Sequence, residues 1–186
     1  MAIEAGDFKT GLTLLIEGNI YQVLDFLHVK PGKGAAILKT KLKNLRTGSI
    51  LERNFNATTK FEQAMITRKE VSYSYCADGT YYFMDNETYD MYEISEDAIG
   101  FSKNFLIDGC PVVLKFFEEE VLNVDLPDKV VLTVTETTGA VAGNTATNAQ
   151  KDAVVETGLL VKVPLFIKEG DKIVVTTTEG KYDRRA

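Results

Sequence analysis

The stretch YQVLDFLHVKPGKGAAILKTKLKNL, residues 21–45, decides the fold of this chain. Strand-forming residues fill its first part, and in its second part three lysines alternate with Leu38, Thr40 and Leu42. Between the two parts, KPGKG at residues 30–34 carries the proline and glycines of a turn. The pattern predicts a β-hairpin with the lysines on one face and the leucines toward a core. The lysines are Lys39, Lys41 and Lys43.

The tip of this hairpin carries Lys33 between Gly32 and Gly34, just after Lys30 and Pro31. The pair Pro31-Gly32 suits the centre of a type II turn, because proline presets φ and glycine accepts a positive φ. The sequence therefore predicts a tight, exposed turn that displays one long cation.

The net charge of -6 is unevenly distributed along the chain. Residues 1–64 carry nine basic and six acidic residues (+3), residues 65–126 carry four and thirteen (-9), and residues 127–186 carry eight of each. From Lys30 to Arg46 the chain contains basic residues and no acid, which is the electrostatic footprint of a phosphate-binding strip. Lysines that only solvate the outer face of a hairpin are an equal alternative. The candidate phosphate-binding residues are Lys39, Lys41, Lys43 and Arg46.

Short apolar or alternating runs, separated by turns, recur along the whole chain and predict an all-β protein of small barrels or sandwiches. Short helices are expected only at 59–64 and 95–108, the second with Ser102 as a cap. A parallel α/β fold would need long crossover helices, which are absent from the pattern. The shifts in charge and composition predict three domains, with the bounds 1–64, 65–126 and 127–186.

Two further segments admit two readings each. The run TTGAVAGNTATNAQKD, residues 137–152, is small and polar, and it predicts a long loop that is either functional or a connection without consequence. The tyrosine-rich segment 73–92 suits base stacking, but its spacing favours packing within a sheet.

The sequence contains no recognisable catalytic or metal-binding motif. Gly32-Lys33 precedes Gly34 and a strand, so it is not a phosphate-binding P-loop. His28 is the only histidine, and it has no second histidine to assist it. We therefore expect no catalytic residue, no metal and no cofactor.

Several features of the sequence indicate the cellular compartment in which the chain acts. Cys76 and Cys110 lie far apart and are expected to be two buried thiols rather than a disulfide. The run 118–120 of three glutamates is expected to be a solvated hairpin end. No stretch approaches the roughly 18 apolar residues that a membrane span needs, and the opening MAIEAGDFKT lacks the pattern of a secretory signal. We expect a cytoplasmic protein without a membrane partner.

Three stretches, in this order and spacing, resemble bacterial elongation factor P. They are KPGKG at 30–34 with the basic strand and NLRTG at 44–48, YYFMDNETYDMYEI at 81–94, and KDAVVETGLLVKVPLFIKEGDKIVVTTTEGKY at 151–182. The resemblance implies an N-terminal SH3-like (KOW-type) barrel and two OB-fold barrels in an L-shaped, tRNA-like arrangement. It covers the whole chain.

The resemblance also implies a function and partners. Members of the family bind the ribosome, with its large and small subunit rRNA, beside P-site peptidyl-tRNA and relieve stalls at consecutive prolines. Lys33 corresponds to the tip lysine of the family, which a lysine-modifying enzyme extends in many members and which holds the CCA end of the tRNA. Pro31 resembles the loop of relatives with an aminopentanol extension. The protein is expected to act as a monomer and not as an enzyme.

Two further sites follow from the resemblance alone. The loop of Gly143, Asn144, Thr145 and Ala146 aligns with a region that lies near the E-site codon, although the family more often has Asp where this chain has Asn144. Near the C-terminus, Tyr182 and Arg184 resemble residues that approach RNA.

Three other functions compete with this one. An elongation factor P paralogue would share the fold but relieve a different set of stalls. A generic OB-fold binder of single-stranded nucleic acid would explain the barrels, but the charge of residues 65–126 opposes a continuous positive groove. A small hydrolase that uses Asp or Glu lacks a supporting constellation of residues.

Overall fold

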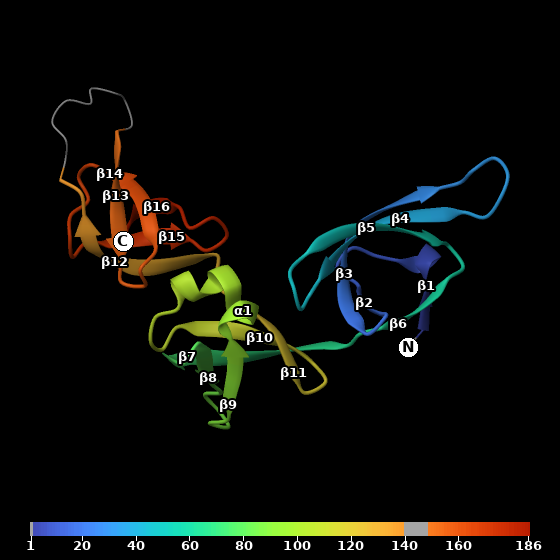
Figure 1. The fold of residues 1–186 in the computed structure, drawn as a ribbon, viewed down its shortest axis with the longest axis horizontal. Helices are drawn as coiled ribbons and strands as arrows, with labels where there is room; N and C mark the ends of the chain where they lie inside the picture. Colours follow the sequence, from blue (N-terminus) through green and yellow to red (C-terminus); the bar gives the residue numbers. More distant parts are fainter. Residues whose placement is uncertain (1, 140–148) are drawn as a thin grey trace. The chain divides into compact units, whose positions relative to one another are not determined.

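The computed structural model describes residues 2–139 and 149–186, and these residues form three antiparallel β-sheets with very little helix (Figure 1). The predicted all-β class is confirmed. Within the described residues no helix has the length and apolarity to cross a bilayer. The chain divides into two compact units, residues 1–69 with 114–123 and residues 70–113 with 124–186. The three-domain bounds near 64 and 127 stay a prediction.

The first sheet has the strand order β1-β6-β2-β3-β4-β5. Its core is a buried cluster that includes Phe8, Leu14, Val23, Leu38 and Leu42. The four of these residues that lie on strands alternate with half-buried or exposed residues, which is why the strands form and curl around one interior. The strands are β1 (Ala2–Glu4), β2 (Thr13–Ile16), β3 (Asn19–Val29), β4 (Ile37–Asn44), β5 (Ile50–Asn56) and β6 (Lys60–Gln63), and a 3-10 turn covers Ala5–Asp7.

The helix expected at 59–64 is wrong, because Lys60–Gln63 is strand β6. It pairs with β1 and β2, and the Phe61 ring lies 5.5 Å from Phe8 and 4.7 Å from Phe55 between ring centroids. Closing the sheet around this aromatic cluster outweighs the local preference of so short a segment for helix.

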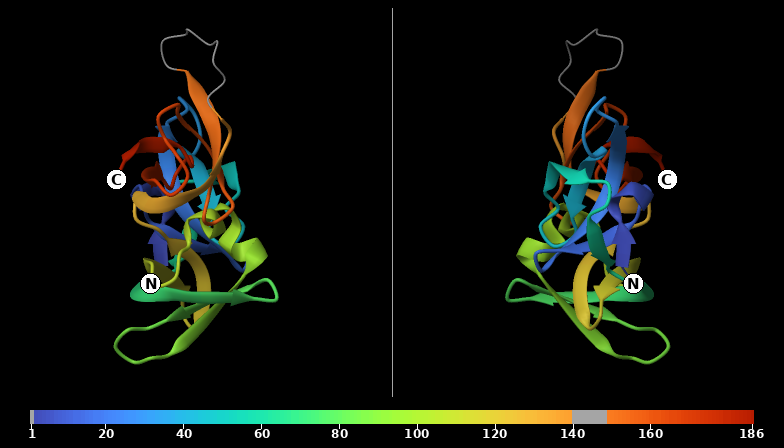
Figure 2. Two further views of the ribbon diagram at one scale, coloured as in Figure 1. Left: turned by 90° about the vertical axis from the view of Figure 1, so that its left-hand side faces the viewer. Right: turned by 90° about the vertical axis from the view of Figure 1, so that its right-hand side faces the viewer.

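The second sheet has the order β11-β10-β7-β8-β9. Its two hairpin ends, between β7 and β8 and between β8 and β9, extend to opposite sides in Figure 2. The helix expected at 95–108 is confirmed, but its cap is Ser95, whose Oγ accepts from the Ala98 N–H at 3.4 Å, and Ser102 lies inside the helical stretch. The elements are β7 (Ile66–Ala77), β8 (Thr80–Met84), β9 (Met91–Ser95), α1 (Glu96–Ile99), a 3-10 helix (Gly100–Phe105), β10 (Pro111–Phe117) and β11 (Glu120–Asp125).

Part of the tyrosine-rich segment packs within this second sheet, as its spacing favours, whereas Tyr75 and Tyr89 are exposed. The Tyr73 ring lies 5.6 Å from Phe83, which is fully buried. Both cysteines are free, so the absence of a disulfide is confirmed, but only Cys110 is buried. Cys76 is exposed because it lies near the open end of β7, where the hairpin leaves the core.

The third sheet has the order β14-β13-β12-β15-β16. Val, Leu and Ile residues at alternate positions, including Leu132, Val163 and Ile173, fill its core. Strand β13 already begins at Gln150, so the last residues of the loop predicted at 137–152 are strand instead. The strands are β12 (Lys129–Thr137), β13 (Gln150–Val155), β14 (Leu160–Pro164), β15 (Lys172–Thr176) and β16 (Tyr182–Arg185).

Candidate nucleic-acid interface

Strands β3 and β4 form the predicted hairpin. Their register runs from Tyr21↔Asn44 to Val29↔Ile37, with a bulge at Leu24, and β5 pairs with β4 from Ile37 to Lys43. Because β4 is hydrogen-bonded on both sides, the hairpin is a supported part of the barrel and not an isolated arm. Just before the tip, the backbone N–H of Ala57 donates a hydrogen bond to the Ala36 carbonyl at 2.9 Å.

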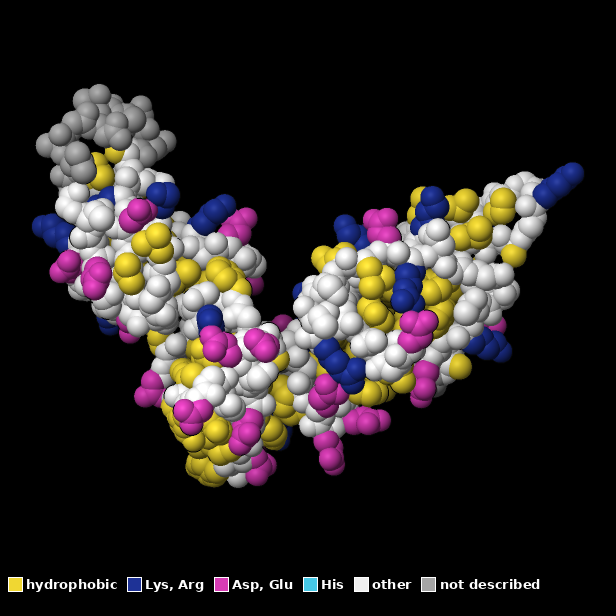
Figure 3. Space-filling view, in the orientation of Figure 1, with side chains coloured by type: hydrophobic (Ala, Val, Ile, Leu, Met, Phe, Trp, Pro, Cys, Tyr) yellow, Lys and Arg dark blue, Asp and Glu magenta, His cyan; other side chains and the backbone are white. Residues whose placement is uncertain are grey.

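The loop 30–36 extends beyond the last strand pair, and its residues 30–35 are exposed. A Cβ added at Gly32 or Gly34 would meet no atom within 4 Å, so the space beside Lys33 is open. No ion pair joins Lys33 to any residue in the described part of the chain. In Figure 3 a Lys or Arg side chain marks the far end of this hairpin.

The type II turn predicted at Pro31-Gly32 is wrong. Such a turn requires a positive φ at Gly32, but the positive φ of the tip, +114°, belongs to Gly34. The chain reverses over seven residues between β3 and β4 instead of four, so the tip is a wider loop than a tight turn. Gly34 is the position where the backbone conformation requires glycine.

The lysines of β4 alternate with buried residues, as predicted. Leu38, Thr40 and Leu42 are buried at 0%, 2% and 0% exposure. Their neighbours Lys39 and Lys41 are exposed, and Lys43 is half-buried. We call the outer surface that carries these three residues the lysine face; they are Lys39, Lys41 and Lys43.

Cross-strand neighbours of the lysine face include acids that the linear sequence does not reveal. Lys41 lies opposite Asp25 on β3 and Glu52 on β5. Exposed apolar side chains also share this surface, since Leu27 is the partner of Lys39 and Ile50 is the partner of Lys43. The lysine face and its neighbours therefore form a mixed surface. Its three lysines and two acids give a net charge of +1.

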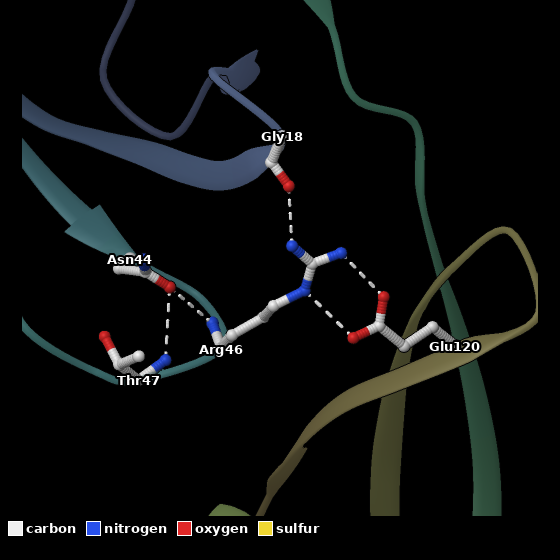
Figure 4. A network of polar contacts seen from close by, with 5 residues as sticks. All are labelled: Gly18, Asn44, Arg46, Thr47 and Glu120. Carbon is white, nitrogen blue, oxygen red and sulfur yellow. Dashed lines mark hydrogen bonds and ion pairs between the residues drawn. The ribbon is translucent and has the colours of Figure 1, made fainter.

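Arg46 follows β4 and has a different environment from the lysines (Figure 4). Its Nε and Nη2 donate to the two carboxylate oxygens of Glu120 at 2.9 and 2.7 Å, and its Nη1 donates to the Gly18 carbonyl at 2.7 Å. The backbone beneath it is held by Asn44, whose Oδ1 accepts from the N–H groups of Arg46 and Thr47. This two-pronged pairing has the geometry of strong arginine–carboxylate contacts.

The Arg46–Glu120 pair changes the acidity of both groups. The side-chain hydrogen bond with Glu120, opposed by desolvation, raises the pKa of Arg46. The same hydrogen bond lowers the pKa of Glu120 from its ordinary value of 4.5. Each of the three guanidinium nitrogens thus donates one hydrogen bond within the chain, which gives Arg46 a structural role, and phosphate binding by Arg46 stays a prediction.

A small apolar cluster lies beside this pair. Ile20 and Leu45 from the first barrel pack with Leu122 of β11, and Phe117 of β10 packs against them. The β10–β11 hairpin end accordingly groups with the first barrel as one compact unit. The three glutamates at 118–120 do form a hairpin end, as expected, with Glu120 as the partner of Arg46.

The C-terminal candidates differ from one another. Tyr182 is half-buried and packs against the core of the third sheet, whereas Arg184 is exposed. The predicted codon-proximal residues 143–146 lie outside the described residues and stay a prediction.

Within residues 2–139 and 149–186, no group of three His, Cys, Asp or Glu side chains is placed to hold a metal ion. His28 is exposed, and its ring meets the edge of Phe26 at 5.7 Å between centroids.

Models of one protein family match the chain in three consecutive stretches. The elongation factor P KOW-like domain matches residues 4–61, the elongation factor P OB domain matches residues 66–124, and the elongation factor P C-terminal domain matches residues 130–185. The first stretch contains the β3–β4 hairpin and its tip. The KOW and OB descriptions confirm the barrel types expected for the first two domains.

Solved structures with a similar fold include two translation factors. Eukaryotic translation initiation factor 5A from Methanococcus jannaschii is 21% identical, with a TM-score of 0.52, and the match covers 67% of this chain and 95% of that one. A translation initiation factor eIF-5A family protein from Naegleria fowleri is 14% identical, with a TM-score of 0.55 and the same coverage. These likenesses show a shared fold alone. The three consecutive family matches span nearly the whole chain, and the chain belongs to the elongation factor P family.

Proposed function

We propose that this translation elongation factor binds the ribosome beside P-site peptidyl-tRNA and promotes peptide-bond formation where consecutive prolines stall synthesis. Lys33, with or without a covalent extension, holds the CCA end of the tRNA in a reactive geometry. The observation that carries the proposal is the tip loop: one exposed lysine between two glycines with open space around them. This loop lies in the stretch that the KOW-like model matches.

The chemistry of the tip suits entry into a narrow RNA channel. A lysine ammonium is a compact charge on a flexible stem, and holding it in place costs conformational entropy. A loop with no bulky neighbours brings that charge forward on a hairpin supported on both sides by strands. The tip then supplies a cation to RNA phosphates without needing a catalytic acid or base.

Positioning alone is sufficient for the proposed effect. Orienting two bound reactants lowers the activation barrier, because their translational and rotational entropy has already been lost on binding. A disturbed geometry costs on the order of a hundredfold in rate. Proline attacks slowly because its ring restricts the approach, so orientation has most effect there. The factor acts without catalytic residues of its own, and it works in the cytoplasm.

The lysine face supplies affinity rather than specificity. Lys39, Lys41 and Lys43 contact RNA phosphates along the side of the hairpin, which positions the factor and makes its binding sensitive to salt. A lysine-modifying enzyme of unknown identity acts on Lys33. In the C-terminal barrel, exposed Arg184 contacts RNA, while Tyr182 acts through packing.

A reconstituted translation assay tests the proposal. With a messenger that encodes three consecutive prolines, we expect the Lys33→Ala variant to lose on the order of a hundredfold in the rate of full-length synthesis. Lys9→Ala, which removes another exposed lysine of the same domain, is the matched control and should remain active. Full activity of Lys33→Ala would overturn the proposal. Tight binding to free oligonucleotides without ribosomes would instead identify a generic nucleic-acid binder.

A further inference from the structure

The second sheet has an outward surface rich in tyrosine and methionine, on the side opposite its buried Phe83 and Ile94. Register places Tyr75 opposite Tyr82 and Tyr82 opposite Glu93, and it pairs Met84 with Met91. We call this surface the tyrosine–methionine face; it consists of Tyr75, Tyr82, Met84, Met91 and Glu93.

The large side chains of the tyrosine–methionine face remain in contact with solvent. Tyr75 is 50% exposed and Met91 is 44% exposed. The Tyr75 and Tyr82 rings stack at 4.5 Å between centroids with an interplanar angle of 18°. We call this stacked pair the Tyr75–Tyr82 platform; it lies on the side of the sheet away from Phe83 and Ile94, and such a surface suits binding of a partner.

The turn between β8 and β9 displays a further aromatic ring. Tyr89 is 71% exposed and has a φ of 61°, a conformation that is uncommon for a bulky residue. The turn is held by Asp85, whose Oδ1 accepts from the N–H of Glu87 at 2.8 Å and whose carbonyl accepts from the N–H of Tyr89. Tyr89 therefore protrudes from a turn with a defined backbone, next in the chain to the strand that carries Met91.

The charge around this face is negative. Glu93 belongs to it, and Asp90 lies beside it in the chain. Register places Glu93 opposite Tyr82, and desolvation first, followed by the charge of Glu93, raises the pKa of Tyr82. In Figure 3 hydrophobic and acidic side chains mingle over the part of the molecule where Figure 1 places β8 and β9. With -9 over residues 65–126, the surroundings repel phosphate and attract cations.

We propose that the tyrosine–methionine face binds an extended protein segment that carries arginine. A guanidinium is planar and weakly hydrated, so it stacks on a tyrosine ring while its donors pair with a carboxylate. The Tyr75–Tyr82 platform and Glu93 offer these two contacts side by side. The adjacent Met84 and Met91 are flexible apolar side chains that adapt to a neighbouring residue of the segment. Lysine satisfies the carboxylate but stacks less well.

Methionine methyl signals in NMR spectra test this proposal on the full chain. Met84 and Met91 lie on the face, and Met65, which is 71% exposed, lies outside it and serves as an internal reference. The probe is a synthetic peptide of four Arg-Gly repeats, and the comparison peptide replaces each arginine with lysine. We expect saturable shifts of Met84 and Met91 with the arginine peptide, weaker binding of the lysine peptide, and little change at Met65.

Variants test the individual contacts. Tyr75→Ala and Glu93→Gln are each expected to weaken binding of the arginine peptide about two- to fivefold, as loss of an exposed cation–π or charge contact should. Glu169→Gln, an exposed carboxylate of the third domain, is the control and should leave affinity unchanged. Equal affinity for both peptides, equal shifts at Met65, or shifts of Met84 and Met91 with an oligouridylate RNA would overturn the proposal.

Discussion

Arg46 and Lys33 belong to the same basic run of the sequence, and their surroundings in the folded chain are opposite. The Arg46 guanidinium donates to Glu120 and to the Gly18 carbonyl, and its side chain is 34% exposed. Lys33 stands on an exposed loop, with no ion pair to the described residues. The comparison shows that residues of one basic run can have different roles. Arg46 stabilises its own compact unit, whereas Lys33 is available to bind a partner.

Among changes that spare Lys33 itself, the largest effect is expected from reversing the charge of the lysine face. The double variant Lys39→Glu and Lys41→Glu should weaken ribosome binding by about tenfold or more at low salt, and the slope of log affinity against log salt should fall by about two. Binding measured across a salt series checks both values. Lys60→Glu, another exposed lysine of the same domain, is the control. An unchanged slope would mean that these lysines only solvate the hairpin.

The lysines of β4 could be predicted from the sequence, but the acids on the neighbouring strands β3 and β5 could not. Alternation along residues 37–44 predicted the lysine face, because side chains on a strand follow a period of two and burial needs only that rule. The acids beside Lys41 were not predictable, since they depend on the register of β3 and β5 and on a bulge at Leu24. A shift of one residue in the pairing of these strands would have placed other side chains opposite Lys41.

The role of Arg46 could not be predicted from the sequence, for a similar reason. Its partner Glu120 is 74 residues away, and nothing local to either residue indicates the other. The tip was predictable in composition but not in conformation. Gly34, and not Gly32, has the positive φ, because the width of the loop depends on where the strand pairing stops.

Removing the Arg46–Glu120 pair should lower stability by a smaller amount. Both side chains are about a third to a half exposed, so solvent screens the pair, and we expect Arg46→Gln to cost about 1 kcal/mol in the free energy of unfolding. Arg53→Gln, which breaks the longer contact to Glu17, should cost less. Urea unfolding measures both.

A double-mutant cycle isolates the interaction itself. If the pair stabilises the unit, Arg46→Gln and Glu120→Gln combined should cost less than the sum of the two single changes, by several tenths of a kcal/mol. Strict additivity would show that Arg46 stabilises the unit through its contact with Gly18 alone.

The two tip glycines provide a matched pair of substitutions. Ala at Gly34 should strain the backbone by about 1 kcal/mol, because its φ of +114° disfavours a side chain, and it should reduce polyproline synthesis several-fold by displacing Lys33. Ala at Gly32 meets open space and needs no positive φ, so it should leave activity intact. Equal activity of both variants would show that the loop conformation does not position the lysine.

The smallest effect expected is a pH dependence. Since the folded-state pKa of Glu120 lies below its ordinary value of 4.5, the pair contributes stability above that pH and loses it as the pH falls through the lowered pKa. The stability difference between the native chain and Glu120→Gln should therefore shrink as the pH falls below about 4.5. Urea unfolding at a series of acidic pH values measures it, and a difference that grows toward acid would contradict the assignment.

The most direct test of the account is a cryo-electron microscopy map of the factor bound to a ribosome stalled on consecutive prolines. The account predicts density for Lys33 against the CCA end of the P-site tRNA, with Lys39 and Lys41 facing RNA phosphates and Arg46 still paired with Glu120. A map in which Lys33 lies in solvent, away from any tRNA, would contradict it.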